Sequence, residues 1–330
     1  MTTRLLAAAT LAALTALSAG RAFAEVPVDP DPIWTLQIEN DALNGTDRYY
    51  SSGIRLGWTS PTDQNVPDAV SRLGRFLFQD GRQRVSIDLA QTFFTPYNTQ
   101  DNPPDPRDRP YAGVLLLNTA LIQDTETTRS VFGASFGLVG PGAGGEEIQN
   151  GFHDLIGDTR AQGWGYQIHN QPLIQFLAER TWRFPLGELG GVEFDTLPSA
   201  TGSVGLYRDY AQLGLQFRLG QGLQSDFGPA RIRPGLSGSD AYTQTEPFVW
   251  YLFAGADGQA VGYDVTLNGN LFSSSRHVAP QPWQAEFQGG VAMMAWGWRL
   301  SFTHVIRTQE FFHQRGGYFN FDSLAVSAKF

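Results

Sequence analysis

The segment IWTLQIEND (residues 33–41) alternates apolar and polar side chains along its whole length. One face carries Trp34, Leu36 and Ile38, and the other carries Thr35, Gln37, Glu39 and Asp41, which is the period of a half-buried β-strand. The same alternation recurs in SSGIRLGW (51–58) and AQLGLQFRLG (211–220). Because the polar faces carry Arg, Gln and Gly, the pattern favours a wet or crowded barrel lumen over a sandwich core.

Strand-like segments continue along most of the chain. With the three above, thirteen candidates can be counted, the others being 84–95, 111–123, 129–139, 173–184, 191–203, 246–256, 259–271, 283–294, 296–307 and 318–330. A bacterial barrel with both ends in the periplasm needs an even number of strands. We therefore predict an all-β fold, a transmembrane antiparallel β-barrel of twelve strands, with the surplus candidate inside 173–220. The terminal LAVSAKF (324–330) suits a closing strand that ends in a lipid-facing aromatic residue.

The amino-terminal residues are typical of an export signal. Arg4 precedes an Ala-rich apolar run, and Ala22-Phe23-Ala24 fits a small-x-small cleavage site. We predict a cleaved signal peptide at 1–24 rather than a membrane anchor, and one domain at 25–330, because no Pro/Ser-rich linker divides the remainder. Cysteine is absent, so this domain does not depend on disulfides.

The composition favours the bacterial outer membrane. After residue 24 no 18-residue apolar stretch occurs, which excludes a transmembrane helix but not a barrel. Glycine is abundant at 37 residues, and charged residues make up 17% of the chain, below the roughly 25% of typical soluble domains. The net charge of −9 argues against a nucleic-acid partner. A narrow barrel of this size needs no second subunit to close, so we expect a monomer.

One segment has helical rather than strand-like spacing. GGEEIQNGFHDLIG (144–157) follows a Gly-rich break, and its two glutamates fall in the first turn, where the helix dipole favours anions. Gln149 and His153 lie four residues apart and therefore on one face. Gly157 is a plausible end to the helix. We predict a rim helix at 145–157.

Strand parity brings this helix together with other polar residues. If the chain starts in the periplasm, Asn40, Asp41, Ser51, the 96–110 loop and the helix all gather at the extracellular rim. An imidazole such as that of His153 can act there as a general base, and a nearby acid could hold a hard cation such as Ca²⁺. We read the acidic 98–110 loop as mostly solvated. Seven aromatic residues are expected to form membrane-interface girdles: Trp34, Tyr49, Tyr50, Trp58, Trp283, Trp296 and Trp298.

Three blocks of sequence resemble a known family. ENDALNGTDRYYSSGIRLGW (39–58), DRPYAG (108–113) and GPGAGGEEIQNGFHDLIG (140–157) are similar, in this order, to the outer-membrane lipid A deacylases, which remove the 3′-O-linked acyl chain of lipid A. The resemblance implies a twelve-stranded barrel with a calcium-dependent site at the outer-leaflet rim, acting on lipid A or lipopolysaccharide.

The resemblance also implies site residues. It assigns the catalytic set His153, Gln149, Asn40 and Ser51, where Ser51 takes the place of a threonine, and it makes Asp41 a calcium ligand. The implied mechanism is hydrolysis by a water molecule that His153 deprotonates. Two positions depart from the family pattern.

The first departure concerns the second calcium ligand. The family has a glutamate six residues after the histidine, and this chain has Thr159 there, with Asp158 adjacent and Asp154 on the helix. We assign the metal to Asp41 and Asp158, with Asp154 as an alternative. The second departure is a family lysine that aligns near Asp101, for which Arg107 or Arg109 could substitute.

Two other functional classes remain open. A non-catalytic barrel, a narrow pore or scaffold, would need only the lumen-facing polar residues. A phospholipase with a serine nucleophile is less favoured, because His153 is followed by Asp154-Leu155 and His304 by Val305-Ile306, so neither histidine forms a His-x-Ser pair.

Overall fold

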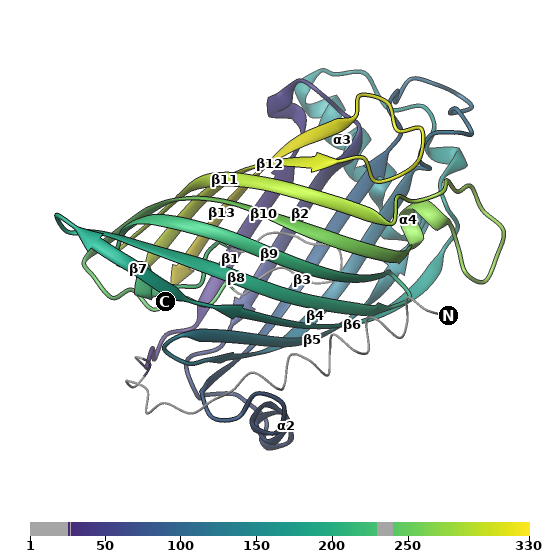
Figure 1. The fold of residues 1–330 in the computed structure, drawn as a ribbon. Helices are drawn as coiled ribbons and strands as arrows, with labels where there is room; N and C mark the ends of the chain where they lie inside the picture. The colour runs from purple at the N-terminus through teal and green to yellow at the C-terminus, as the bar shows by residue number, and fades with distance from the viewer. Residues whose placement is uncertain (1–25, 27, 230–239) are drawn as a thin grey trace.

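The structure, a computed structural model, describes residue 26, residues 28–229 and residues 240–330. The predicted signal peptide at 1–24 lies outside the described residues. A single antiparallel sheet curls into a closed barrel (Figure 1), because β6 pairs with β8 as well as with β5. The ring contains the following twelve strands: β1 (Ile33–Asn40), β2 (Tyr49–Thr59), β3 (Arg82–Thr95), β4 (Ala112–Asp124), β5 (Thr128–Val139), β6 (Gln171–Trp182), β8 (Val192–Gly205), β9 (Arg208–Gln221), β10 (Phe248–Asp264), β11 (Trp283–Ala295), β12 (Trp298–Thr308) and β13 (Tyr318–Lys329).

The predicted strand number is confirmed, but the surplus candidate was placed in the wrong segment. Candidates 246–256 and 259–271 belong together: β10 is one strand that pairs with β9 and β11 across Asp257-Gly258. This dipeptide is a hairpin signal when read locally, but hydrogen bonds to a neighbour on each side keep it extended. Within 173–220 the structure instead adds β7 (Phe184–Leu189), which pairs with β8 and projects beyond the ring.

The alternation in the sequence matches the two faces of the barrel wall. In β1 every second side chain from Ile33 to Glu39 is buried, whereas Trp34, Leu36 and Ile38 are exposed on the outer face. The lumen is crowded with ion pairs, including Arg55–Asp240 at 2.6 Å and Arg218–Asp226 at 2.8 Å. Each strand therefore turns its apolar face to lipid and its polar face to this interior.

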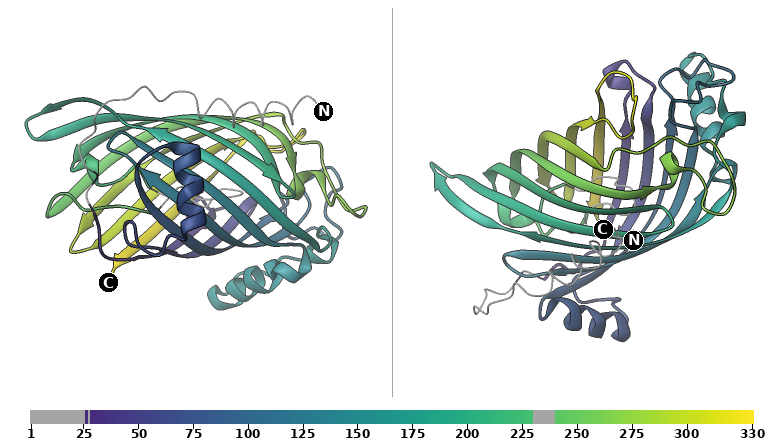
Figure 2. Two further views of the ribbon diagram at one scale, coloured as in Figure 1. Left: turned by 90° about the horizontal axis from the view of Figure 1, so that it is seen from below. Right: turned by 45° about the vertical axis from the view of Figure 1, so that its right-hand side comes forward.

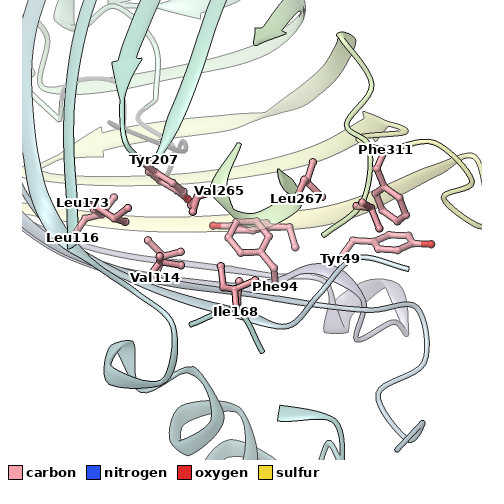
Figure 3. Packing of buried hydrophobic residues seen from close by; sticks show 14 of the residues in the cluster. Tyr49, Phe94, Val114, Leu116, Ile168, Leu173, Tyr207, Val265, Leu267 and Phe311 are labelled. Atoms are coloured by element: carbon pink, nitrogen blue, oxygen red, sulfur yellow. The ribbon is translucent and has the colours of Figure 1, made fainter. Parts of the chain in front are cut away.

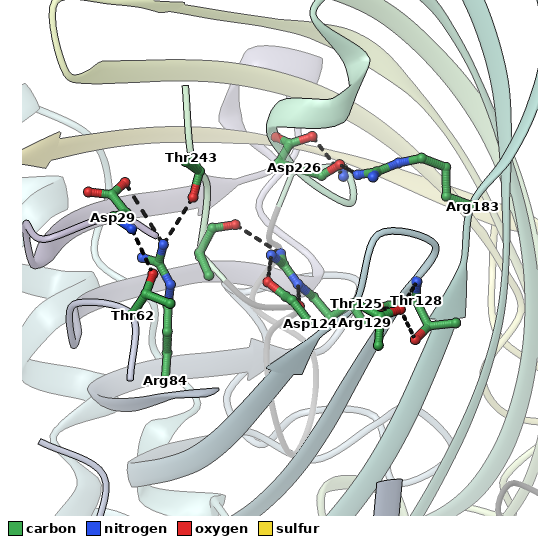
Figure 4. Close-up of polar contacts among 12 residues, drawn as sticks. Asp29, Thr62, Arg84, Asp124, Thr125, Thr128, Arg129, Arg183, Asp226 and Thr243 are labelled. Atoms are coloured by element: carbon green, nitrogen blue, oxygen red, sulfur yellow. Dashed lines mark hydrogen bonds and ion pairs between the residues drawn. The ribbon is translucent and has the colours of Figure 1, made fainter. Parts of the chain in front are cut away.

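Both ends of the lumen are filled by parts of the chain that fold inward. At one end, Val265 and Leu267 of α4 (Val265–Asn268) pack with Phe311 and other buried residues (Figure 3). At the other end, Asp226 and Thr243 join a polar network with arginines of the wall (Figure 4). Two interior cavities there measure about 50 and 90 Å³. The interior is packed, which argues against a conducting pore.

Three long connections lie at one end of the barrel, which we call the site rim. These are 96–111, 140–170 and 265–282, and the 140–170 connection contains α3 (Gly145–Ile156) and η3 (Trp164–Tyr166). The predicted rim helix is thus present, and it ends at Gly157, which has the left-handed φ of 74°. Ile33 and Lys329, the outer ends of the first and last strands, pair at the opposite end of the barrel. With both chain ends in the periplasm, as we predicted, the site rim faces the cell exterior.

A helix that we did not predict lies at the opposite end. α2 (Asp68–Phe78) packs against the outside of the wall below β3 and β4 (Figure 2). A Cβ atom at Gly74 would come within 2.8 Å of Gln83, Leu121 and Gln123, so the glycine permits this close approach. Among the described residues, no helix is long and apolar enough to cross a membrane.

The aromatic residues assigned to the membrane-interface girdles fall into two groups. Trp34, Trp283, Trp296 and Trp298 are exposed on the outside of the barrel. Tyr49 and Tyr50 were assigned wrongly: both are buried, because a β-bulge and the rim loops bring them into the apolar cluster that closes the barrel mouth. The Tyr50 hydroxyl donates to Glu39 at 2.8 Å inside the lumen.

Candidate active site

A cavity of about 650 Å³ lies at the site rim, between α3 and the outer face of the barrel wall. All six residues that the sequence singled out for catalysis or metal binding line it: Asn40, Asp41, Ser51, Gln149, His153 and Asp158. The rest of the lining includes apolar side chains that are exposed on the lipid-facing wall: Ile38, Ile54, Phe302 and Leu324. The cavity therefore combines polar groups with a surface that contacts the membrane.

Close backbone packing fixes the position of α3. The first residue of the helix, Gly145, lies against Gly113 at the start of β4, and a Cβ atom on Gly145 would be 3.0 Å from the Gly113 Cα atom. The same Cβ atom would be 2.7 Å from the ring of buried Trp164. Two glycines meeting in this way let the helix touch the wall, and this contact presents Gln149 and His153 toward the cavity.

His153 is held in one orientation by a backbone group. Its Nδ1 atom lies 2.7 Å from the carbonyl oxygen of Thr159. Because a carbonyl oxygen can only accept, Nδ1 carries the proton, and Nε2 of the neutral ring is unprotonated. Nε2 lies 3.5 Å from the carboxylate of Asp47. The ring therefore has the arrangement of a general base.

Asp47 is a site residue that the sequence reasoning missed. Its carboxylate accepts hydrogen bonds of 2.8 and 2.9 Å from the Gln149 amide, and it lines the cavity next to His153. Burial raises its pKa, while His153 and the hydrogen bond from Gln149 oppose the shift. The only signal in the sequence was its place between Asn40 and Ser51, inside the first motif block.

Gln149 connects two parts of the site. It is 1% exposed, it donates to Asp47, and its carbonyl oxygen accepts from the indole nitrogen of Trp164 at 2.7 Å. This second bond fixes which end of the amide faces Asp47. Gln149 thus positions Asp47 beside His153.

Ser51 faces the cavity because of a β-bulge. The pairing of β2 with β3 skips Ser51, since Tyr50 is opposite Phe94 and Ser52 is opposite Phe93. A bulge turns the extra side chain away from its regular direction, and both Ser51 and Ser52 line the cavity. The Ser51 hydroxyl lies 2.6 Å from that of Thr95.

Asp41 is a buried acid whose carboxylate accepts hydrogen bonds from two uncharged donors. Its exposure is 2%, and it accepts hydrogen bonds of 2.8 Å from the Thr46 hydroxyl and the Arg48 backbone nitrogen. Burial raises the pKa of Asp41 to about 8. A cation placed beside such a buried acid stabilises its ionised form.

Asp158 lines the cavity with Asp41, whereas Asp154 forms an ion pair with Arg160 and Thr159 offers its carbonyl to His153. Within the described residues, no three Asp, Glu or His side chains are already grouped to hold a metal ion. Calcium also takes backbone carbonyl oxygens and water as ligands. The cavity offers the carboxylates of Asp41 and Asp158 together with other oxygen-bearing side chains, and this set of donors fits a calcium ion.

The arginines considered as replacements for the family lysine are not at the cavity. Arg109 is buried in the barrel interior and pairs with Glu310 at 2.8 Å. Arg107 points outward and pairs with Asp105. That suggestion was wrong, because the 96–111 loop directs one arginine inward and the other into solvent.

A closed barrel with an apolar outer wall, and with a histidine- and acid-lined cavity on that wall, defines an outer-membrane protein with a membrane-facing site. The chain belongs to the family described as "Outer membrane protein LpxR", whose profile matches residues 5–330. Its location is the bacterial outer membrane.

A solved structure of another chain has the same fold. LpxR from Salmonella typhimurium superposes with a TM-score of 0.74 at 22% identity, covering 90% of this chain and 100% of that one. The β domain of the Bordetella autotransporter BrkA gives a TM-score of 0.42 at 10% identity, covering 92% and 99%. A search of curated protein sequences gave no significant match.

Proposed function

We propose that the protein is a calcium-dependent esterase that removes an ester-linked acyl chain, of the 3′-O type, from lipid A in the outer leaflet. One observation carries this proposal: His153, oriented as a base, lines a cavity whose wall is the lipid-facing surface of the barrel. The resemblance of the three motif blocks to lipid A deacylases supplies the substrate class and the acyl position.

The lining of the cavity suits a lipid held at the membrane surface. Ile38, Phe302 and Leu324 are exposed on the outer wall and would contact acyl chains. Asn40 and Ser52 lie on the same face of the wall as Ile38 and Ile54, each two residues closer to the rim. An ester at the junction of sugar and acyl chain would lie at this boundary between apolar and polar side chains.

The chemistry follows from the state of His153. Its Nε2 atom takes a proton from a water molecule, and the water oxygen attacks the acyl carbonyl carbon. The ester carbon–oxygen bond then breaks, and the leaving sugar oxygen receives the proton from Nε2. The products are a fatty acid and a free hydroxyl on the lipid. Asp47 stabilises the imidazolium that exists between the two proton transfers.

Calcium would be held by Asp41 and Asp158, with backbone carbonyls and water completing its coordination. When bound, it would supply positive charge that stabilises the developing oxyanion. Gln149 and Asp47 do not depend on the ion for their mutual contact, because they are joined by hydrogen bonds within the protein.

The other two functional classes receive less support. A pore requires an open lumen, and this lumen is filled at both ends. A serine nucleophile requires a histidine at hydrogen-bonding distance, and among the described residues the Ser51 hydroxyl contacts Thr95 at 2.6 Å and the Asp47 carboxylate instead. The geometry therefore favours an attacking water molecule.

Mass spectrometry of lipid A tests the proposal. Purified protein in mixed micelles with lipid A and calcium should release one acyl chain, and His153→Ala should reduce the rate by about 100-fold or more. Ser51→Ala should keep measurable activity, whereas a serine nucleophile would make this variant inactive. Unchanged acylation with folded wild-type protein and calcium present would overturn the proposal.

A further inference from the structure

A second histidine lies on the lipid-facing wall beside the cavity. His304 of β12 is opposite Asp322 of β13, and its Nδ1 atom is 2.8 Å from the Asp322 carboxylate. The other carboxylate oxygen accepts from the side chain of Asn44 at 2.9 Å. Asp322 lines the cavity, and the His304 side chain is 39% exposed. None of these three residues has a role in the hydrolysis described above.

These three residues lie at about the same height along the barrel axis as the proposed reacting groups. Strand pairing places Ser52 opposite Asn40, Asn40 opposite Asp322, and Asp322 opposite His304. Neighbouring strands are about 4.8 Å apart, so His304 lies roughly 10 Å from Asn40 around the wall. Two residues further from the rim, the same strands carry a row of exposed apolar side chains: Ile54, Ile38, Leu324 and Phe302.

This arrangement matches the shape of a glycolipid at a membrane surface. The apolar row would contact acyl chains, and the polar row would lie at the height of the sugars. With the scissile ester at His153, the remaining sugar would extend along the polar row toward Asp322 and His304. A polar pair on the lipid-facing side of a strand is costly when nothing polar contacts it, and a headgroup would supply that contact.

The hydrogen bonds define which chemical group His304 can bind. Because an ionised carboxylate only accepts, Nδ1 of His304 carries the proton, and Nε2 of the neutral ring is an acceptor. A hydroxyl group can donate to Nε2, whereas a fully ionised phosphate cannot, and a phosphate would also be repelled by the Asp322 carboxylate. The pair is therefore suited to a sugar hydroxyl.

We propose that His304, oriented by Asp322 and Asn44, is a binding subsite that accepts a hydrogen bond from a sugar hydroxyl of the glycolipid headgroup. This inference rests on the proposed function, because it assigns a place to the substrate of that reaction. His304 is a specificity-determining residue that touches the substrate away from the bond that breaks.

Two substitutions separate a subsite from a purely structural clamp. His304→Asn can still bond to Asp322 but does not reach as far as Nε2, whereas His304→Gln places an amide oxygen near the position of Nε2. If His304 is a subsite, His304→Asn should raise the KM for lipid A about fivefold, which corresponds to the loss of one net hydrogen bond, and should leave kcat unchanged. His304→Gln should have the KM of the wild type. If His304 only holds the two strands together through Asp322, His304→Asn should keep the wild-type KM and His304→Gln should raise it.

The control substitution is His277→Asn. His277 is an exposed histidine at the site rim, and its Nδ1 contacts the carbonyl oxygen of Ser275 in its own loop. Its KM should equal that of the wild type. Heat-modifiable mobility on gels shows that each variant has folded. A wild-type KM for His304→Asn, or an equal increase for Asn and Gln, would overturn the proposal.

Binding of intact lipid A separates this proposal from the proposed function. His153→Ala and His153→Ala/His304→Asn are compared for their affinity toward lipid A in nanodiscs, and the double variant should bind about fivefold more weakly. This difference tests the subsite even if the wild-type protein hydrolyses nothing. If the difference disappears with dephosphorylated lipid A, the ligand is a phosphate and the assignment to a hydroxyl is wrong.

Discussion

The Nδ1 atom of His153 lies 2.7 Å from the carbonyl oxygen of Thr159. At the position of Thr159 the family resemblance predicts a glutamate. In this chain the backbone carbonyl of Thr159 contributes to the site, and it fixes the tautomer of the His153 imidazole whatever side chain stands at this position. Loss of the glutamate therefore affects the expected metal shell and leaves the orientation of His153 intact.

Gln149→Leu should lower kcat by about tenfold to 100-fold, roughly 1.4 to 2.8 kcal/mol. The apolar side chain leaves both the Asp47 carboxylate and the Trp164 indole nitrogen without their buried partner. Steady-state release of fatty acid from lipid A measures the effect. Trp164→Phe, which removes only the indole contact, should have a smaller effect, and an equal loss in both variants would contradict the role given to Asp47.

Gly145→Ala should reduce activity by at least about tenfold without unfolding the barrel, since a shift of about 1 Å at a site can cost this much or more. The added methyl group would overlap Trp164 and crowd Gly113, so α3 must move. Gly151→Ala is the matched control in the same helix, because nothing lies within 4 Å of its added Cβ atom. Equal activity of the two variants would show that the glycine contact does not position the helix.

Asp158→Asn should weaken calcium binding by about tenfold or more, because it removes one of the two proposed carboxylate ligands. Asp154→Asn should bind calcium like the wild type, since Asp154 is paired with Arg160 away from the cavity. Isothermal titration with calcium alone gives the affinities, independent of turnover. The assignment of Asp158 fails if the two variants bind equally well.

Asp41→Asn should flatten the pH dependence of stability in the presence of a chelator. The pKa of Asp41 is about 8 in the folded protein against an ordinary 3.8, so the folded state retains the proton after the unfolded state has lost it. The free energy of unfolding therefore falls as pH rises through this window, and the loss is complete above it. Asparagine does not titrate, and its oxygen can accept from both Thr46 and Arg48.

Urea unfolding from about pH 5 to about pH 9 measures this effect. The two proteins should diverge as pH rises, with Asp41→Asn the more stable at the alkaline end. Added calcium should stabilise the wild type and not the variant, because the ion binds the ionised carboxylate. Parallel curves for the two proteins would show that Asp41 does not titrate in this range.

The sequence predicted the ring of twelve strands correctly and misplaced the surplus candidate. Asp257-Gly258 resembles a turn when it is read alone, and only pairing with β9 and β11 keeps it extended. Tyr50 likewise looked like a membrane-facing aromatic residue. It is buried because the bulge at Ser51 changes which way β2 directs its side chains near the rim.

The candidate site could be predicted only as far as the motif blocks reached. The position of α3 agrees with its helical spacing, and the six singled-out residues share one cavity; their individual roles stay predictions. Asp47 and α2 were missed for different reasons. Asp47 meets its partner Gln149 across 102 residues of sequence, and α2 is an amphipathic helix inserted between two strands.

The sequence by itself determined that this chain is a barrel with a lipid-facing outside, because the direction of each side chain along a strand is a local property with a period of two. The meeting of His153, Gln149, Asp47 and Asp41 was decided only by the tertiary structure. It depends on the side-by-side pairing of β1 to β5, on the contact of Gly145 with Gly113, and on one bulge. These features arise from packing between segments far apart in the chain, which no local pattern records.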